Sequence, residues 1–307
     1  MDDLNANIAT VIVGVVVVCI SGWVTIAARL CQRQPILPYA FRREAPWGLW
    51  DLFLILILAF GPSIAIGLYF QPLMIPGKPN HRVLAELLRW NSLVSVISIL
   101  GMISYFQFRP HASLKDVGLD LRRLGYQVGV GIACFVLVAP IVFAIQATFV
   151  LVLDIESKHP LIELLKNDPS AFYMCAFLAV VVAPISEELV FRGFLQGWLE
   201  RLPLFHADLE AFLLGQRETT EEDDQLFQEC NRKLQRVAPM PILLSSMIFA
   251  LMHFSHGPDP VALFVLALAL GYVYQRTHCL LPCVIVHACL NGTTMLFLWL
   301  SLDELSK

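Results

Sequence analysis

Charge is scarce in this 307-residue chain. Asp, Glu, Lys and Arg make up 15 % of the residues, hydrophobic residues make up 57 %, and the mean hydropathy is +0.68. This composition excludes a soluble domain and predicts an all-α polytopic membrane protein. Its expected surroundings, and thus its predicted partner, are the lipids of the bilayer. The sequence has no basic stripe and no RNA- or DNA-binding motif, so it predicts no nucleic-acid partner.

Two cysteine and histidine patterns are also missing. The eight cysteines form no CxxC pair and lie mostly inside apolar runs, which is typical of core- or lipid-facing thiols. The HExxH pattern of zinc proteases does not occur either. The N-terminus, MDDLNAN, is acidic and is followed by no clear cleavage site. We therefore expect the first apolar run to be a retained transmembrane helix.

Apolar runs of about 17 or more residues give most of the membrane spans. We expect about eight transmembrane helices, near residues 8–28, 49–70, 91–108, 125–153, 170–198, 241–255, 260–276 and 280–300. Residues 1–154 would form about four helices that carry no motif. Residues 155–300 would form the functional core, with a polar cavity and a loop at 199–239.

Basic residues in the loops predict the orientation. Fourteen Lys and Arg residues follow the odd-numbered spans, whereas six lie on the other side. The positive-inside rule then places both termini outside the cytoplasm and the 199–239 loop inside it. That loop carries an acidic run at 218–224, which is typical of a solvated spacer.

The segment 170–198 contains three ionisable residues in an otherwise apolar helix: Glu187, Glu188 and Arg192. A charge near the middle of the bilayer costs at least about 2.5 kcal/mol, so such residues usually have a function. Glu188 and Arg192 are four residues apart and can pair on one helix face. Glu187 is turned by about 100° from Glu188 and has no opposite charge one turn away. It is therefore a candidate acid–base group.

Three further polar residues lie in the late apolar segments. His253 is part of FALMHF, and His287 and Asn291 are four residues apart in VIVHACLNG. Imidazole and carboxamide groups on one helix face can together stabilise an oxyanion. A single histidine inside a membrane is more often an interhelical hydrogen-bond partner, but six such residues in three helices favour one common site.

These residues form three ordered motifs: EExxxR at 187–192, FxxxH at 249–253 and HxxxN at 287–291. They resemble the CPBP family of intramembrane proteases, which includes type II CAAX prenyl proteases and bacteriocin-processing or immunity proteins. GYVYQRT at 271–277 and HPLIELL at 159–165 are also similar to the family. The resemblance covers roughly residues 155–295, and the 199–239 insertion is long for the family.

The resemblance implies an intramembrane endopeptidase that cleaves a peptide or a lipidated protein near the cytoplasmic face. Glu187 would activate water, His253 would hold that water, and His287 and Asn291 would stabilise the oxyanion. Glu188 and Arg192 would support the site. We favour a mechanism that requires no cofactor. The alternative is zinc held by Glu187, His253 and His287, because catalytic zinc takes about three protein ligands.

Two other classes of function use the same residues. A proton-coupled transporter could relay protons through Glu187, His253 and His287, although the chain has no inverted repeat. A non-catalytic scaffold or immunity protein would share all three motifs.

Overall fold

The described parts of the chain are helical throughout. The computed structural model describes residues 2–40, 46–73, 81–110, 112–152, 165, 171–200, 209–215, 225, 238–254 and 259–305, and no strand occurs among them. The longer helices are α1 (Asp2–Cys31), α2 (Leu49–Phe70), α3 (His81–Phe108), α4 (Leu124–Leu151), α11 (Pro239–Met252), α12 (Asp259–Thr277) and α13 (Leu280–Leu305). This confirms the all-α polytopic fold class.

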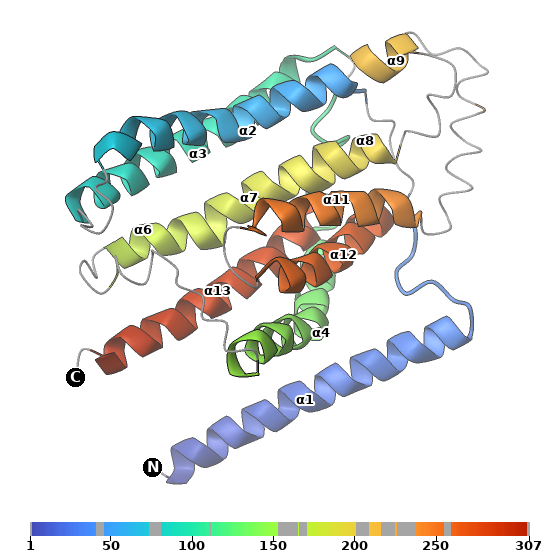
Figure 1. Cartoon of the computed structure of the whole chain (residues 1–307). Coiled ribbons are helices and arrows are strands. Elements are labelled where there is room, and N and C mark those ends of the chain that lie inside the picture. Colours follow the sequence, from blue (N-terminus) through green and yellow to red (C-terminus); the bar gives the residue numbers. More distant parts are fainter. Residues whose placement is uncertain are drawn as a thin grey trace.

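A straight rod of consecutive helical segments runs through the middle of the bundle (Figure 1). Its segments are α6 (Phe172–Phe177), η3 (Leu178–Val182), α7 (Ala183–Glu188), η4 (Leu189–Gln196) and α8 (Gly197–Leu199). The segments η3 and η4 are π-helical, so each of their turns takes up about one residue more than an α-helical turn. Such π segments occur mostly at functional sites. The sequence predicted one continuous helix here and gave no sign of the two π segments.

Among the described residues, seven helical stretches are long and apolar enough to cross a membrane. They are α1, α2, α3, α4, the central rod, α12 and α13, and α11 is a shorter apolar helix. Together they account for all eight predicted segments. We expected the sixth segment to reach residue 255, but α11 ends at Met252 and His253 is its C-terminal cap. With 14 residues, α11 is about 21 Å long, so His253 lies part of the way through the bundle. Residues 255–258, in the helix-breaking stretch after it, lie outside the described residues.

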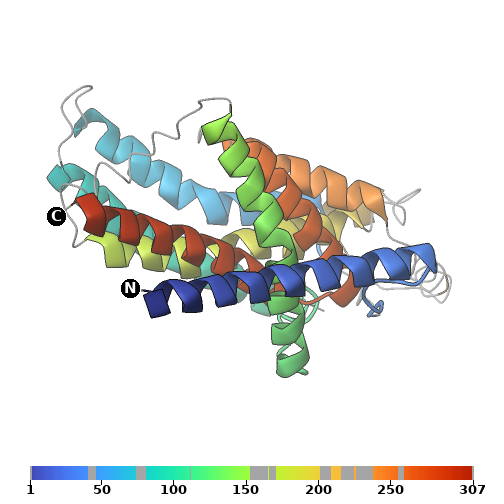
Figure 2. The same cartoon turned by 90° about the horizontal axis from the view of Figure 1, so that it is seen from below.

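The central rod packs against α2 and α3 on one side and against α11, α12 and α13 on the other (Figure 1). Helix α4 packs on α13 and α12, and Figure 2 shows it crossing the long helices steeply. Helix α1 packs mainly on α4. In both views, α1 begins and α13 ends at the same end of the bundle.

The largest hydrophobic core surrounds the second half of the rod. Trp47 and Phe106 pack edge-on against Phe194, and the Trp47 indole donates a hydrogen bond of 3.0 Å to the Phe194 carbonyl oxygen. The longest described stretch inside the 199–239 loop is residues 209–215. They contain α9 (Leu209–Leu214), which packs near α2. The acidic run at 218–224 lies outside the described residues.

Candidate active site

The two adjacent glutamates of the rod face different surroundings. The Glu188 side chain is fully buried, whereas that of Glu187 is 23 % exposed. The difference follows from the turn of about 100° between consecutive residues of a helix. One carboxylate therefore belongs to the protein interior, and the other can be reached from outside the core.

Glu188 is held from two sides. Its Oε1 lies 2.9 Å from Nδ1 of His287 on α13, and its Oε2 lies 3.2 Å from Nε of Arg192, one turn along the rod. The predicted Glu188–Arg192 pair is therefore present, with both side chains fully buried. The Arg192 guanidinium carbon also lies 5.1 Å from the centre of the Phe249 ring, a favourable cation–π distance.

Glu187 faces the two histidines. Its Oε2 lies 3.8 Å from Nε2 of His253 and 3.9 Å from Nε2 of His287. The other ring nitrogen of each histidine already has a partner: His253 Nδ1 lies 2.8 Å from the Phe249 carbonyl oxygen, and His287 Nδ1 bonds Glu188. A carbonyl oxygen only accepts hydrogen bonds, so His253 carries a proton on Nδ1. In the neutral ring its Nε2 is then an acceptor.

Asn291 lies one helical turn after His287 on α13, as its spacing predicts. Its side-chain amide donates a 2.8 Å hydrogen bond to the carbonyl oxygen of Ala179 in η3. This contact joins α13 to the rod eight residues before Glu187. The structure thus brings Glu187, Glu188, Arg192, His253 and His287 into one cluster, while the Asn291 side chain bonds η3.

Phe249 is the site residue that the sequence left without a role. Its ring lies 4.8 Å from that of His253 and 6.0 Å from that of His287, centre to centre, and it is fully buried. Its ring thus lies near Arg192 and both histidines, and its carbonyl oxygen orients His253. The only sequence signal for it is its place four residues before His253.

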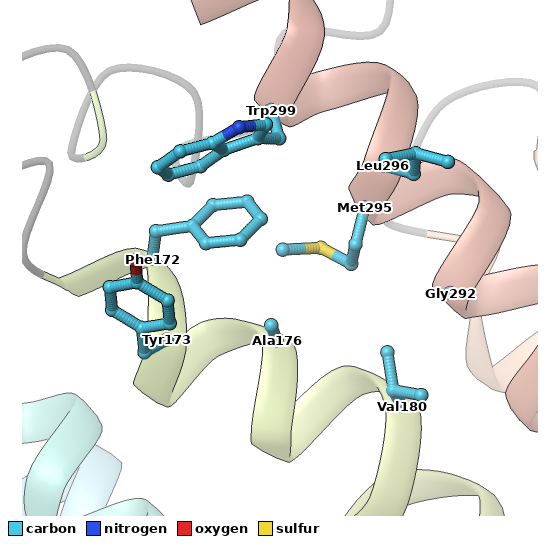
Figure 3. Close-up of a pocket in the computed structure, with 8 residues that line it drawn as sticks. All are labelled: Phe172, Tyr173, Ala176, Val180, Gly292, Met295, Leu296 and Trp299. Atoms are coloured by element: carbon cyan, nitrogen blue, oxygen red, sulfur yellow. The ribbon is translucent and has the colours of Figure 1, made fainter.

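An apolar pocket lies beside Asn291, between the start of the rod and α13 (Figure 3). Its volume is about 360 Å³. Figure 3 shows the Phe172 and Trp299 rings next to each other in its wall, and their centres are 4.6 Å apart, so the two rings pack together. Its walls also include Val180 and Gly292, the immediate neighbours of Ala179 and Asn291. The pocket therefore adjoins the hydrogen bond between those two residues.

Among the residues that the structure describes, no group of three or more His, Cys, Asp or Glu side chains is placed to hold a metal ion.

Comparison with known proteins gives one match. Residues 169–293 match the model of the family described as type II CAAX prenyl endopeptidase Rce1-like. A search of the curated proteins and a search of the solved structures each found no match. The matched segment includes all six predicted site residues, and the family supports an intramembrane endopeptidase of the CAAX type in an integral, multi-pass membrane protein. The match over residues 169–293 is consistent with a CPBP family intramembrane protease and confirms the resemblance that the three motifs predicted.

Proposed function

We propose that the chain hydrolyses a peptide bond with a water molecule held between Glu187 and His253. One observation carries this proposal: the Glu187 side chain is partly exposed, and its Oε2 lies 3.8 Å from an imidazole nitrogen. The neutral His253 offers a lone pair at Nε2, and a carboxylate also only accepts. Glu187 Oε2 and His253 Nε2 are therefore both hydrogen-bond acceptors, 3.8 Å apart. A water molecule between them can donate one hydrogen bond to each.

In the proposed reaction, Glu187 takes one proton from this water as the new C–O bond forms at the substrate carbonyl carbon. The carbonyl oxygen becomes an oxyanion. A protonated His287 donates to it from Nε2 while its Nδ1 donates to Glu188, and Asn291 can use the N–H that does not bond Ala179. Glu187 then gives its proton to the nitrogen of the leaving amine, and the C–N bond breaks.

Glu188 and Arg192 support this site without contacting the substrate. A carboxylate on Nδ1 fixes both the orientation and the tautomer of an imidazole, and Arg192 in turn fixes the carboxylate. The charges of Glu188 and Arg192 also compensate each other in a fully buried environment, where a single charge would be costly.

For the substrate, we propose a peptide or lipidated protein tail that reaches the site near the cytoplasmic face, including a CaaX-type prenylated tail. The orientation follows from the excess of basic residues in the loops on one side. The pocket of Figure 3 offers an apolar surface beside Asn291 for an apolar group of such a substrate.

The proposed mechanism requires no metal ion. If zinc were bound, Glu187, His253 and His287 would hold it, and it would act as a Lewis acid. Every step above is assigned to the chain's own residues and water.

The test is a peptide-cleavage assay on detergent-purified protein with the variant Glu187→Gln. Cleavage should fall by about 10²–10⁴-fold, because a glutamine cannot accept the proton from water. The matched control is Glu200→Gln in the residue that follows α8. Glu200 is also buried in the rod, but it accepts a hydrogen bond from Gln196 away from the site.

The control should retain most of the activity, and both variants should elute as the wild type does on size exclusion. Wild-type cleavage by Glu187→Gln would rule out Glu187 as the base. A wild-type protein that cleaves no peptide would favour the scaffold, whereas uptake driven by a pH gradient in vesicles would favour the transporter.

A further inference from the structure

A second cavity lies between α1, α4 and α12, away from the candidate active site. Its volume is about 600 Å³, within the range of about 300–1,000 Å³ typical of ligand sites. Its walls are almost entirely apolar and include Trp23, Ile36, Leu37, Gly129, Ala133 and Tyr272.

The cavity exists because α1 touches the bundle at a narrow contact. Gly22 lies against Leu137 so closely that a Cβ at this glycine would be 2.5 Å from the leucine Cδ2 atom. The Trp23 indole donates a 3.2 Å hydrogen bond to the carbonyl oxygen of Leu137. An apolar cavity holds water poorly, and an empty one forfeits dispersion contacts. In a bilayer, hydrocarbon is therefore the favoured occupant.

The shape of the cavity fits one lipid chain. On α4 its lining extends from Tyr126 to Val138, twelve residues or about 18 Å along the helix. That is slightly more than half of the roughly 30 Å hydrocarbon core of a bilayer, the depth that the acyl chain of one leaflet occupies.

Arginines surround the end of the cavity where α1 ends, α4 begins and α12 ends. Arg29 donates to the Pro35 carbonyl oxygen at 3.1 Å, beside the lining residue Ile36. Arg276 donates to the carbonyl oxygen of Leu37, also a lining residue, at 2.9 Å. Arg123 is exposed and lies three residues before Tyr126. Basic groups beside a pocket between membrane helices favour anionic lipid headgroups.

We infer that this cavity binds one anionic glycerophospholipid, with an acyl chain along α4 and its phosphate near Arg29 and Arg123. The apolar walls favour an acyl chain, and the arginines at the end of the cavity favour an anionic headgroup. This inference is independent of the proposed proteolysis, because no lining residue belongs to the cluster around Glu187.

The test is native mass spectrometry of the full chain, purified in detergent and mixed with equal amounts of phosphatidylglycerol and phosphatidylcholine. We expect one phosphatidylglycerol to be retained per chain, with a preference of about tenfold from the two exposed arginines. Gly129→Phe should abolish retention, because nothing lies within 4 Å of a Cβ at Gly129 and the ring can fill the cavity. Gly67→Phe in α2 is the matched control, since a Cβ there also meets nothing within 4 Å.

The double variant Arg29→Gln, Arg123→Gln should keep one bound lipid but lose the preference for phosphatidylglycerol. Arg89→Gln, an exposed arginine of α3 paired with Glu86, should change neither. As a second measurement, phosphatidylglycerol should raise the melting temperature of the wild type and of Gly67→Phe but not that of Gly129→Phe. Equal retention of both lipids by the wild type, or undiminished retention by Gly129→Phe, would overturn the inference.

Discussion

Two arginine–carboxylate pairs of the described residues, Asp51–Arg109 and Glu188–Arg192, differ in their burial and in how many of their polar atoms are hydrogen-bonded. Asp51 on α2 accepts hydrogen bonds from the Gly48 amide at 2.7 Å and from the Tyr105 hydroxyl. It also lies 2.7 Å from Nη1 of Arg109. Arg109 further donates to the carbonyl oxygen of Leu214 in the 199–239 loop. This group joins α2, α3 and a loop segment far along the chain.

The Glu188–Arg192 pair is less complete. Within the described parts of the chain, all three Arg192 guanidinium nitrogens have no hydrogen-bond partner that meets geometric criteria, and neither do Glu187 Oε2 and Glu188 Oε2. In the Asp51–Arg109 pair, Nε of Arg109 alone is in this state. Buried polar atoms are normally satisfied, and exceptions are concentrated where a ligand or a reaction uses them. The comparison therefore separates a pair that holds the fold together from a cluster available for chemistry.

The largest expected effect concerns the Asp51–Arg109 pair. Asp51→Ala removes the counter-ion of Arg109 and the acceptor of the Tyr105 hydroxyl, and breaking a buried pair costs about 3–5 kcal/mol. We expect the free energy of unfolding in detergent to fall by that amount, while the kcat of the remaining folded protein stays unchanged. A fall in kcat without a loss of stability would mean that this pair, too, serves the reaction.

The control for that variant is Asp120→Ala, in the loop before α4. Asp120 pairs with Arg122, whose side chain is 73 % exposed. Hydrogen bonds from Arg122 lower the pKa of Asp120 to about 2, so the pair is charged at pH 7. An exposed pair contributes about 0–1 kcal/mol, and the unfolding free energy at pH 7 should change by no more than that.

The second prediction concerns the Glu188–Arg192 pair. Glu188→Gln keeps a group that can bond His287 but removes the charge that favours its imidazolium form. Losing such a supporting partner typically costs about 10–100-fold in activity, so kcat should fall by that factor with little change in KM. The pH profile of kcat should also shift, which a merely structural role would not produce. An unchanged profile would contradict the role of Glu188.

A smaller effect is expected at the pocket of Figure 3. Gly292 lies in its wall, and a Cβ there would meet Val180 at an ordinary 3.7 Å. Gly292→Leu should fill part of the pocket and raise KM for a prenylated peptide by about tenfold, the effect of one or two methylene groups. KM for the same peptide without the lipid should not change. An equal rise for both peptides would place the lipid elsewhere.

For removal of zinc we expect no effect on activity. Prolonged incubation with a zinc chelator should leave kcat and KM unchanged, because the proposed base, water and oxyanion donors all belong to the chain or to solvent. Loss of activity that zinc alone restores would replace the metal-independent mechanism with the zinc alternative.

Much of this arrangement was already visible in the sequence. Glu187, Glu188 and Arg192 stand out because charge is costly in an apolar helix, and the i,i+4 spacing predicted the Glu188–Arg192 pair. The π segments η3 and η4, the orienting role of Phe249 and the end of α11 at His253 were not predicted. Each depends on neighbouring helices rather than on the local pattern of apolar residues.

The sequence by itself determined the helical segments and the residues that had to avoid lipid, because bilayer thickness and the cost of desolvating charge act on every segment separately. Only the tertiary structure decided which glutamate is buried against His287 and which faces His253. It also decided that Asn291 bonds Ala179 and that α1 leaves a cavity beside α4. Helix periodicity gives the angle between two side chains of one helix, but the position of the next helix determines what each of them meets.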